Sequence, residues 1–235
     1  GMNRARILDM EERLLASVRR ILCTSQALLD RFKDRFPTYL LTHGVDLDLF
    51  SHPPKEDHPA LREVPQPRVG YYGLFDGRTD HALLLEIARR MPNVSFVITG
   101  PIEGNIAPLA SVPNIHFTGP VPYAELPAVV RSWKACLLPY RMNQLTEKIN
   151  PLKLKEYLAS SKPVISSPLP EAVKLSAYLR IATSLDDWLQ AISEAVTGAW
   201  VPDARATLEM LKSQGWENKV ERFLRFCAGQ VVAPE

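Results

Sequence analysis

The fold is decided by residues 67–100, PRVGYYGLFDGRTDHALLLEIARRMPNVSFVITG. Residues 67–73 form a nearly continuous apolar run that ends at a glycine, and residues 94–100 repeat that pattern. Between the two runs, residues 80–91 carry apolar side chains at helical spacing. Strands that are apolar without alternation belong in a sheet covered on both faces. The stretch therefore predicts a strand, a helix and a second strand of a parallel sheet.

The same alternation continues toward the C-terminus. We expect strands over residues 115–119, 135–140, 162–167 and 179–183, and helices over residues 123–133, 151–160 and 184–196. Residues 202–227 predict two further helices around Gly215. This spacing indicates an α/β fold with a doubly wound, mostly parallel, Rossmann-like sheet.

Toward the N-terminus the pattern is less regular. We expect helices over residues 5–18 and 25–36, and strands over residues 20–25 and 38–50, the last ending in a glycine turn. Residues 51–67 are rich in proline, histidine and charge, which predicts a linker or an exposed loop. The expected organisation is a flanking part (1–50), this linker (51–67), the sheet domain (68–201) and C-terminal helices (202–235).

Composition bounds the function. The 235 residues are 46% hydrophobic and 23% charged, as in ordinary globular proteins, and a net charge of +2 does not indicate a nucleic-acid binder. The three cysteines predict buried, reduced thiols, and cysteine and histidine show no metal-ligand spacing. No apolar run is long enough to span a bilayer. We therefore expect a cytoplasmic protein with neither a metal nor another cofactor.

The segment with most chemistry covers residues 139–171. Asn150 can cap a helix whose first residue is Pro151, and the free N–H groups of such a helix start favour an anion such as a diphosphate. Lys153 would add a positive charge, and Glu156, one turn later, could accept hydrogen bonds from a ribose diol. The simpler interpretation is an exposed ion pair worth a few tenths of a kcal/mol.

Several motifs in this sequence resemble the large "group 1" family of GT-B glycosyltransferases. The segment NPLKLKEYLASSKPVISSPLPE (150–171) resembles the donor-binding signature of that family. Other segments resemble further family elements and follow in the same order: THGVDLDLF (42–50), residues 69–101, PNIHFTGPVPYAELP (113–127) and SQGWENKVERFL (213–224). Ordered motifs over most of the chain are more specific than any one of them.

The resemblance implies roles for individual residues. Glu156 would bind the ribose, and Lys153, with the backbone of Asn150, Pro151 and Leu152, would hold the diphosphate and stabilise it as the leaving group. The remaining implied contacts, from four loops, are Gly73, Leu74 and Asp76 toward the phosphates, Gly100, Pro101, Val121 and Tyr123 toward the base, and Arg141 and Asn143 toward the sugar or phosphate.

The sequence also departs from the family pattern. Lys148 stands where many members carry a glutamate that contacts the donor sugar, and Glu147 is one residue out of register. His43 replaces an asparagine in the interdomain element, and Ser161 replaces a glycine before Lys162. The contact to the donor sugar and the turn at Ser161 are therefore open points.

As a group 1 member, the chain would be a retaining hexosyltransferase, which moves a sugar from a nucleoside-diphosphate donor to a glycan or lipid-linked acceptor. Residues 1–50 would be a remnant of the acceptor domain and the interdomain element, and residues 68–201 the donor-binding domain. The resemblance implies polysaccharide synthesis at the cytoplasmic membrane face. On this view the 235 residues bind the donor but do not transfer sugar without an acceptor domain.

Three alternatives remain. A nucleotide-sugar epimerase shares the GT-B architecture, although the Glu-Tyr-Leu-Ala signature counts against it. A non-catalytic nucleotide-binding or assembly module would complement a partner chain. A Rossmann-like domain that has lost its ligand is the third alternative.

The C-terminal helices could in addition drive self-association through an apolar face formed by Leu208, Leu211, Val220, Phe223 and Leu224.

Overall fold

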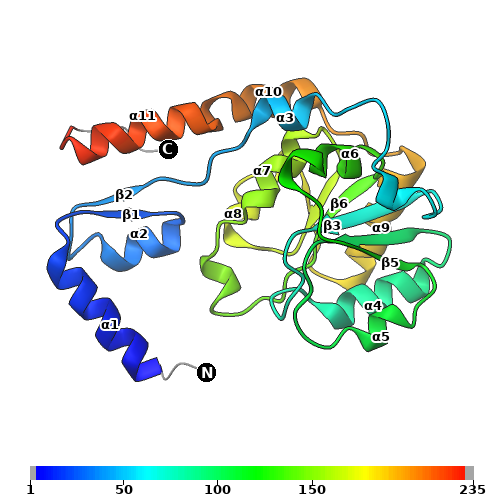
Figure 1. The fold of residues 1–235 in the computed structure, drawn as a ribbon, viewed down its shortest axis with the longest axis horizontal. Helices are drawn as coiled ribbons and strands as arrows, with labels where there is room; N and C mark the ends of the chain where they lie inside the picture. Colours follow the sequence, from blue (N-terminus) through cyan, green and yellow to red (C-terminus); the bar gives the residue numbers. More distant parts are fainter. Residues whose placement is uncertain (1–3, 231–235) are drawn as a thin grey trace.

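The computed structural model describes residues 4–230, and its largest element is a six-stranded sheet (Figure 1). Its strands are β3 (Arg68–Tyr72), β4 (Ser95–Thr99), β5 (Ile115–Gly119), β6 (Ala135–Leu138), β7 (Val164–Ser166) and β8 (Arg180–Ile181). They lie in the order β5-β4-β3-β6-β7-β8, and every neighbouring pair is parallel. The predicted α/β fold with a parallel, doubly wound sheet is therefore confirmed.

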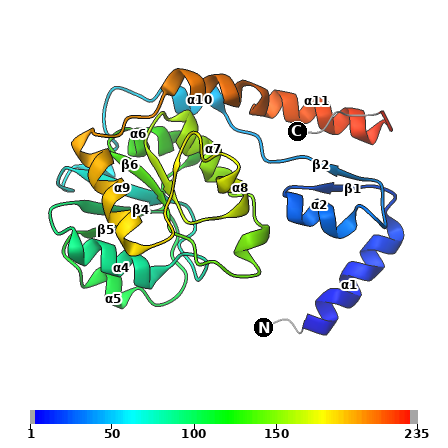
Figure 2. The same cartoon turned by 180° about the vertical axis from the view of Figure 1, so that it is seen from behind.

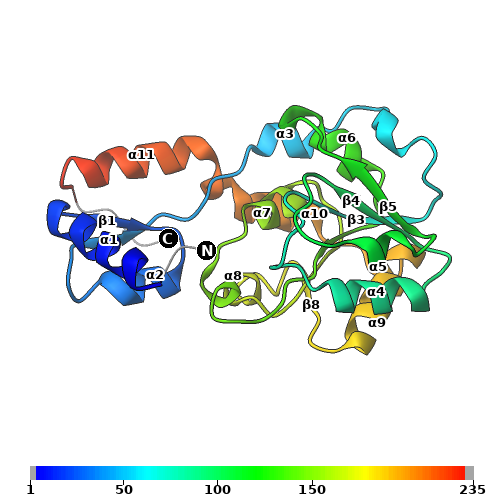
Figure 3. The same ribbon diagram turned by 60° about the horizontal axis from the view of Figure 1, so that its bottom comes forward.

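Helices cover both faces of this sheet (Figures 1 and 3). Their bounds are α4 (His81–Arg90), α5 (Ala107–Ala110), α6 (Leu126–Arg131), α7 (Leu152–Ala159), α8 (Pro170–Val173) and α9 (Leu185–Thr197), with short 3-10 turns η2 (Tyr123–Glu125) and η3 (Thr146–Lys148). Helix α4 packs against α5 and α9, whereas α7 packs against two helices outside this set, α3 (Leu47–Ser51) and α10 (Ala204–Leu211). Every residue of β3 and β4 is buried as a result, which explains their unbroken apolar pattern.

A smaller unit lies beside the sheet domain (Figure 2). It consists of α1 (Arg4–Ser17), β1 (Ile21–Cys23), α2 (Gln26–Phe32) and β2 (Thr38–Leu40), and its two strands pair in parallel. Leu15, Cys23 and Phe32 form its own small core.

The C-terminal helices return to this smaller unit. They are α10 (Ala204–Leu211), the turn η4 (Lys212–Gln214) and α11 (Trp216–Cys227). The ring of Phe226 stacks on Tyr39 of β2 with centroids 5.5 Å apart, and Arg20 donates to the carbonyl oxygens of Phe226 and Cys227. Helix α11 thus connects the sheet domain with the β1–β2 unit.

The apolar face expected on the C-terminal helices is only partly exposed. Leu211 is fully buried, so including it in that face was wrong, and Leu208 is partly buried. Val220, Phe223 and Leu224 of α11 are 54%, 43% and 58% exposed.

The prediction of buried thiols holds for two of the three cysteines. Cys23 and Cys136 are buried, but Cys227, the last residue of α11, is exposed.

The predicted strand over residues 38–50 was too long. Strand β2 ends at Leu40, and helix α3 (Leu47–Ser51) follows, since the carboxylate of Asp46 caps it by accepting from the backbone of Leu49 at 2.9 Å.

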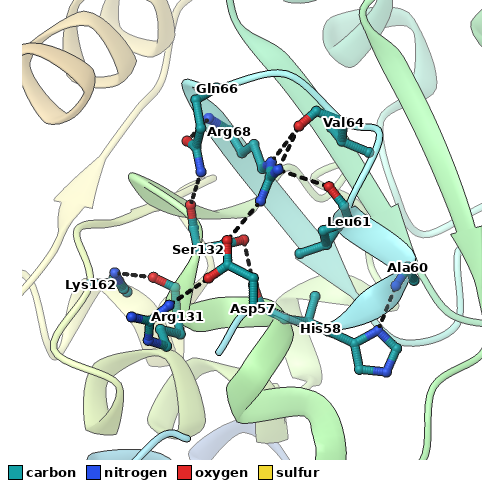
Figure 4. Close-up of polar contacts among 11 residues, drawn as sticks. Asp57, His58, Ala60, Leu61, Val64, Gln66, Arg68, Arg131, Ser132 and Lys162 are labelled. Carbon is teal, nitrogen blue, oxygen red and sulfur yellow. Dashed lines mark hydrogen bonds and ion pairs between the residues drawn. The ribbon is translucent and has the colours of Figure 1, made fainter. Parts of the chain in front are cut away.

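The proline-rich segment 51–67 packs onto the sheet domain. It contains the turn η1 (Pro59–Leu61), and the side chains of Leu61 and Val64 are buried. The guanidinium of Arg68 lies beneath this segment and donates to the carbonyl oxygens of Leu61 and Val64 (Figure 4). Asp57 accepts hydrogen bonds from both Arg68 and Arg131.

Candidate functional site

The strand order points to one edge of the sheet. The chain runs from β3 outward through β4 and β5, and then returns to place β6 on the other side of β3. In parallel sheets, ligands bind beyond the carboxyl ends of strands at such a reversal. We call this region the β3–β6 edge, formed by residues 73–80 after β3, residues 139–151 after β6, and the first turn of α7.

Two glycines bring the backbone of this edge into close contact. Gly73 has a φ of +111° and Gly100 a φ of +131°, in the region that favours glycine. A Cβ on Gly100 would lie 2.4 Å from the carbonyl oxygen of Gly73, so the ends of β3 and β4 touch through the backbone alone. A Cβ on Gly73 would lie 2.7 Å from the Nζ atom of Lys153.

Lys153 therefore reaches across from α7 to the loop after β3. Its Nζ donates to the hydroxyl of Tyr71 at 2.7 Å and lies 4.0 Å from the centroid of that ring. Burial, and then the charge of Arg78, lower the pKa of Lys153 to about 7, although Glu156 and Asp76 oppose the shift. Near neutral pH this amine is only partly charged, so an anion bound beside it would raise its pKa again.

Glu156, one turn further along α7, is held by two tyrosine hydroxyls. Tyr72 donates to one carboxylate oxygen, and Tyr123 donates to the other at 2.9 Å. The side chain is almost completely buried, and this burial raises its pKa although both hydrogen bonds and the charge of Lys153 favour the ionised form. Each carboxylate oxygen has a second lone pair, so Glu156 keeps acceptor capacity beyond the two tyrosines.

The loop after β3 adds a second pair of charges. Arg78 binds the carboxylate of Asp76 through several contacts, the shortest 2.7 Å. Burial would raise the pKa of Asp76, but the hydrogen bonds from Arg78 outweigh it, and the pKa lies below its ordinary value. Asp76 thus neutralises Arg78, while Leu74 of the same loop accepts a hydrogen bond from the Tyr71 hydroxyl at 2.8 Å.

The expected N-cap of α7 was wrong. The helix begins at Leu152 with Pro151 at the capping position, and the side-chain amide of Asn150 instead donates to the carbonyl oxygen of Thr24 at 3.0 Å. The first turn of α7 still points into the β3–β6 edge, and the first N–H groups of a helix have no partner within it. The predicted contribution of the Asn150–Leu152 backbone to an anion site therefore stays a prediction, independent of the cap.

Arg141 and Asn143, on the loop after β6, lie at the same edge. The Arg141 side chain is 51% exposed, with Nε 4.0 Å from Asp80. The side-chain oxygen of Asn143 accepts from the backbone of Leu145 and Thr146, which stabilises the loop. The Asn143 side-chain oxygen is thus engaged within its own loop, whereas the Arg141 guanidinium is more accessible to a ligand.

Of the predicted base contacts, Val121 and Pro101 differ in exposure. Val121 is partly buried against the core, and Pro101 is exposed. The carbonyl oxygen of Pro101 accepts from the backbone of Phe75 at 2.9 Å, which ties the loop after β4 to the loop after β3.

Sequence reasoning missed Tyr71 and Tyr72. Both lie at the end of β3 and are buried, and their hydroxyls bind the two α7 side chains that carry the predicted chemistry. The available signal was a pair of tyrosines in a strand otherwise suited to aliphatic residues, because a buried hydroxyl needs a partner.

A second basic region lies at the opposite, amino-terminal edge of the sheet (Figure 4). It surrounds an open cavity of about 860 Å³ whose polar lining includes Asp57, Gln66, Arg131, Lys134 and Lys162. The ammonium of Lys162 donates to the carbonyl oxygen of Arg131 at 2.6 Å, and that carbonyl ends α6. Lysines cap helix C-termini in this way, and the negative end of α6 disfavours an anion here. We therefore favour the β3–β6 edge as the functional site.

The described residues, 4–230, contain no group of three or more His, Cys, Asp or Glu side chains arranged to hold a metal ion. None of the helices in that range has the length and apolar character needed to cross a membrane.

Comparisons with known proteins found a matching family model and several relatives. A family model described as "Glycosyl transferases group 1" matches residues 66–207, which include β3 to β8, α7 and the β3–β6 edge. The putative teichuronic acid biosynthesis glycosyltransferase TuaH of Bacillus subtilis is 28% identical over 179 residues, which are 72% of this chain and 45% of that protein.

Solved structures show the same fold. Sucrose-phosphate synthase of Thermosynechococcus elongatus aligns with a TM-score of 0.73 and 18% identity, over 97% of this chain and 62% of that one. Anabaena Alr3699/HepE in complex with UDP and glucose aligns with a TM-score of 0.67 and 14% identity, over 90% of this chain and 63% of that one. This chain thus spans less than two thirds of each of these relatives.

Proposed function

Because this chain belongs to the family of group 1 glycosyl transferases, we propose that it is the nucleotide-sugar-binding half of such an enzyme. The observation that carries the proposal is the joint position of Lys153 and Glu156, one turn apart on α7 and both bonded to the end of β3. A cation beside a helix start suits a diphosphate, and a buried carboxylate suits a diol. A nucleoside diphosphate carries both groups, and the UDP and glucose bound by the Anabaena relative support this class of donor.

In the proposed complex, Glu156 accepts the ribose hydroxyls and Lys153 faces the diphosphate with the backbone of residues 150–152. Gly73, Leu74 and Asp76 approach the phosphates from the other side. The base lies toward the loops that carry Gly100, Pro101, Val121 and Tyr123. Arg141 is the candidate contact to the sugar or its phosphate, whereas Asn143 acts on that group through the loop it stabilises.

The proposed reaction is glycosyl transfer with retention. The bond between the anomeric carbon and the diphosphate oxygen breaks, and a bond from that carbon to an acceptor hydroxyl forms on the same face. Lys153 and the start of α7 stabilise the charge that develops on the departing diphosphate. The proposed acceptor is a glycan or a lipid-linked acceptor at the cytoplasmic face of the membrane, and the role in teichuronic acid biosynthesis named for the Bacillus relative supports a glycan.

Nucleotide titration tests the donor site. We expect one of UDP, GDP and ADP to bind, and Lys153→Met and Glu156→Gln each to weaken it about 10- to 100-fold, since each removes a charge-assisted contact. The matched controls are Lys212→Met and Glu209→Gln, which alter an exposed Lys–Glu pair near α10. A chain that binds none of the three nucleotides, or controls that weaken binding equally, would contradict the proposal.

The proposal also covers transfer. We propose that these 235 residues bind the donor without transferring its sugar, because the Bacillus relative is more than twice as long as the part matched here. The measurement is product analysis after incubation with a nucleotide sugar, with and without a glycan acceptor. Sustained transfer by this chain alone would refute this point, and an altered nucleotide sugar without acceptor would indicate an epimerase.

A further inference from the structure

The position of the Lys153 ammonium is set by one side chain, Tyr71. The Tyr71 hydroxyl accepts from Nζ at 2.7 Å and donates to the carbonyl oxygen of Leu74 at 2.8 Å. A single hydroxyl thereby joins α7 to the loop that begins at Gly73. Its acceptor and donor capacities are both used, so rotating it would break two bonds.

Tyr71 cannot easily move. The residue is 1% exposed, and its ring makes edge contacts with Phe75 and Tyr140, at centroid separations of 5.8 Å and 6.4 Å. A ring fixed by packing fixes its hydroxyl, because buried side chains occupy single rotamers. The ammonium is accordingly ordered in the absence of a ligand, which lowers the entropy cost of binding one.

The ordered ammonium points at the loop that would face the phosphates. Nζ lies 2.7 Å from the place a Cβ on Gly73 would take, so the absent side chain leaves room for the charge. It also lies 5.8 Å from the centroid of the Tyr140 ring, at the end of β6. Helix α7 and the ends of β3 and β6 thus converge on this one nitrogen.

We propose that Tyr71 is a positioning residue for donor binding: its hydroxyl holds the Lys153 ammonium against the Gly73 loop, so that a diphosphate meets both together. This inference rests on the proposed function, since it assumes that Lys153 binds the diphosphate. Tyr71 acts through Lys153 and Leu74 and touches no part of the donor.

The charged groups around Lys153 give the proposal a pH signature. They are Glu156 on α7, Asp76 and Arg78 on the loop after β3, and the phenols of Tyr71 and Tyr140. With the pKa of Lys153 lowered to about 7 by burial and by Arg78, donor binding requires proton uptake above neutral pH. Affinity for the nucleotide then falls as pH rises through about 7.

Removing the hydroxyl changes this profile in a defined direction. Tyr71→Phe keeps the ring but removes an acceptor that favours the charged amine, so the pKa of Lys153 falls further. The affinity for UDP, used as the probe, should fall about 10-fold at pH 7.5 and less at pH 6. The pH at which affinity begins to fall should move downward, which a purely structural role would not cause.

A double-mutant cycle provides the test. Calorimetry of UDP binding between pH 6 and 8.5 compares the wild type with Tyr71→Phe, Lys153→Met and the double variant, and Tyr178→Phe is the matched control outside this edge. We expect Tyr71→Phe to cost nothing more once Lys153 is absent, and Lys153→Met to lose the pH dependence. Effects that add, or a Tyr71→Phe profile equal to that of the wild type, would overturn the inference.

A second measurement covers the case in which Tyr71→Phe folds poorly. The pKa of Lys153 is then measured directly in the ligand-free wild type and variant at low temperature. It is read from the resonance of ¹³C-labelled Lys153 Cε as a function of pH, and the expected fall in pKa is the same. A pKa equal to that of the wild type overturns the inference. Loss of binding in Lys153→Met together with normal binding in Tyr71→Phe overturns this inference alone, whereas a wild type that binds none of UDP, GDP and ADP overturns the proposed function with it.

Discussion

At the scale of single residues, a side chain at position 73 would occupy the space that the Lys153 ammonium fills. The positive φ of Gly73 and the Nζ atom beside it each exclude a side chain. Gly77 lies four residues later in the same loop and its φ is not positive. A Cβ on Gly77 would meet no atom of the described residues within 4 Å. The two glycines therefore make a matched pair.

We expect Gly73→Ala to lower the free energy of unfolding by about 1–2 kcal/mol and to weaken nucleotide binding, because the new methyl group displaces the ammonium. Gly77→Ala should leave both quantities unchanged within about 0.5 kcal/mol. Urea denaturation and calorimetry measure the two effects. Equal behaviour of the two variants would mean that the contact with Lys153 has no consequence.

The ionised carboxylate of Glu156 is expected to lower the stability of the fold while serving nucleotide binding. Burial raises the pKa of Glu156 above the ordinary value of 4.5. The protonated side chain therefore contributes fully to the free energy of unfolding below pH 4.5, and this contribution is lost as the pH rises through the raised pKa. We expect Glu156→Gln to raise the free energy of unfolding at pH 7 by about 1 kcal/mol while nucleotide binding weakens. Denaturation between pH 4 and 8 should show the gain shrinking toward pH 4, and a constant difference would contradict this origin.

The sequence was informative about this site where helical spacing applies. Lys153 and Glu156 are three positions apart on one helix, and their proximity follows from that alone. Their partners Tyr71 and Tyr72 come from a strand more than 80 positions away, so nothing local predicted those contacts. Asn150 was assigned to its own helix because local capping rules could not include the more distant carbonyl oxygen of Thr24.

At the scale of elements, the segment before β3 depends on one buried arginine. Arg68 satisfies the carbonyl oxygens of Leu61 and Val64 and pairs with Asp57, which also accepts from Arg131. The segment's proline and charge content predicted a linker or exposed loop. The two apolar anchors, Leu61 and Val64, are too few to establish a periodic pattern among the prolines and charges of this segment, which is why packing was not expected.

We expect Arg68→Met to destabilise the protein by about 3 kcal/mol, because two buried carbonyl groups lose their donor and the Asp57 carboxylate loses one of its two donors. The matched control is Arg90→Met, which breaks an exposed ion pair with Glu86 on α4 and should cost less than about 0.5 kcal/mol. Chemical denaturation compares them. Similar costs would show that the contacts of Arg68 add little to stability.

At the scale of the whole molecule, the alternation of strands and helices predicted a parallel sheet, but not which strands are neighbours. The position of β6 beside β3 is a property of the folded chain, and it determines where the candidate β3–β6 edge lies. Likewise, the amphipathic pattern of α11 indicated a helix with an apolar face. It could not indicate that part of that face packs on β2 and that Val220, Phe223 and Leu224 remain exposed.

Because Val220, Phe223 and Leu224 leave an apolar surface exposed on α11, we expect the protein to show self-association as its concentration rises. We expect Leu224→Lys to reduce it, because a charge in an apolar contact is costly to desolvate. Val201→Lys is the control, since Val201 is 76% exposed but lies outside α11. Sedimentation velocity over a range of concentrations measures the effect. A wild-type chain that remains monomeric throughout would exclude this association.

The exposed thiol of Cys227 offers a practical consequence. It ends α11, which runs away from the sheet (Figure 1), while Cys23 and Cys136 are buried. A maleimide reagent should therefore modify one place, far along the molecule from the β3–β6 edge. Biotin attached there would tether every molecule to a sensor chip at the same point, and a fluorophore there would report any movement of α11 relative to the sheet.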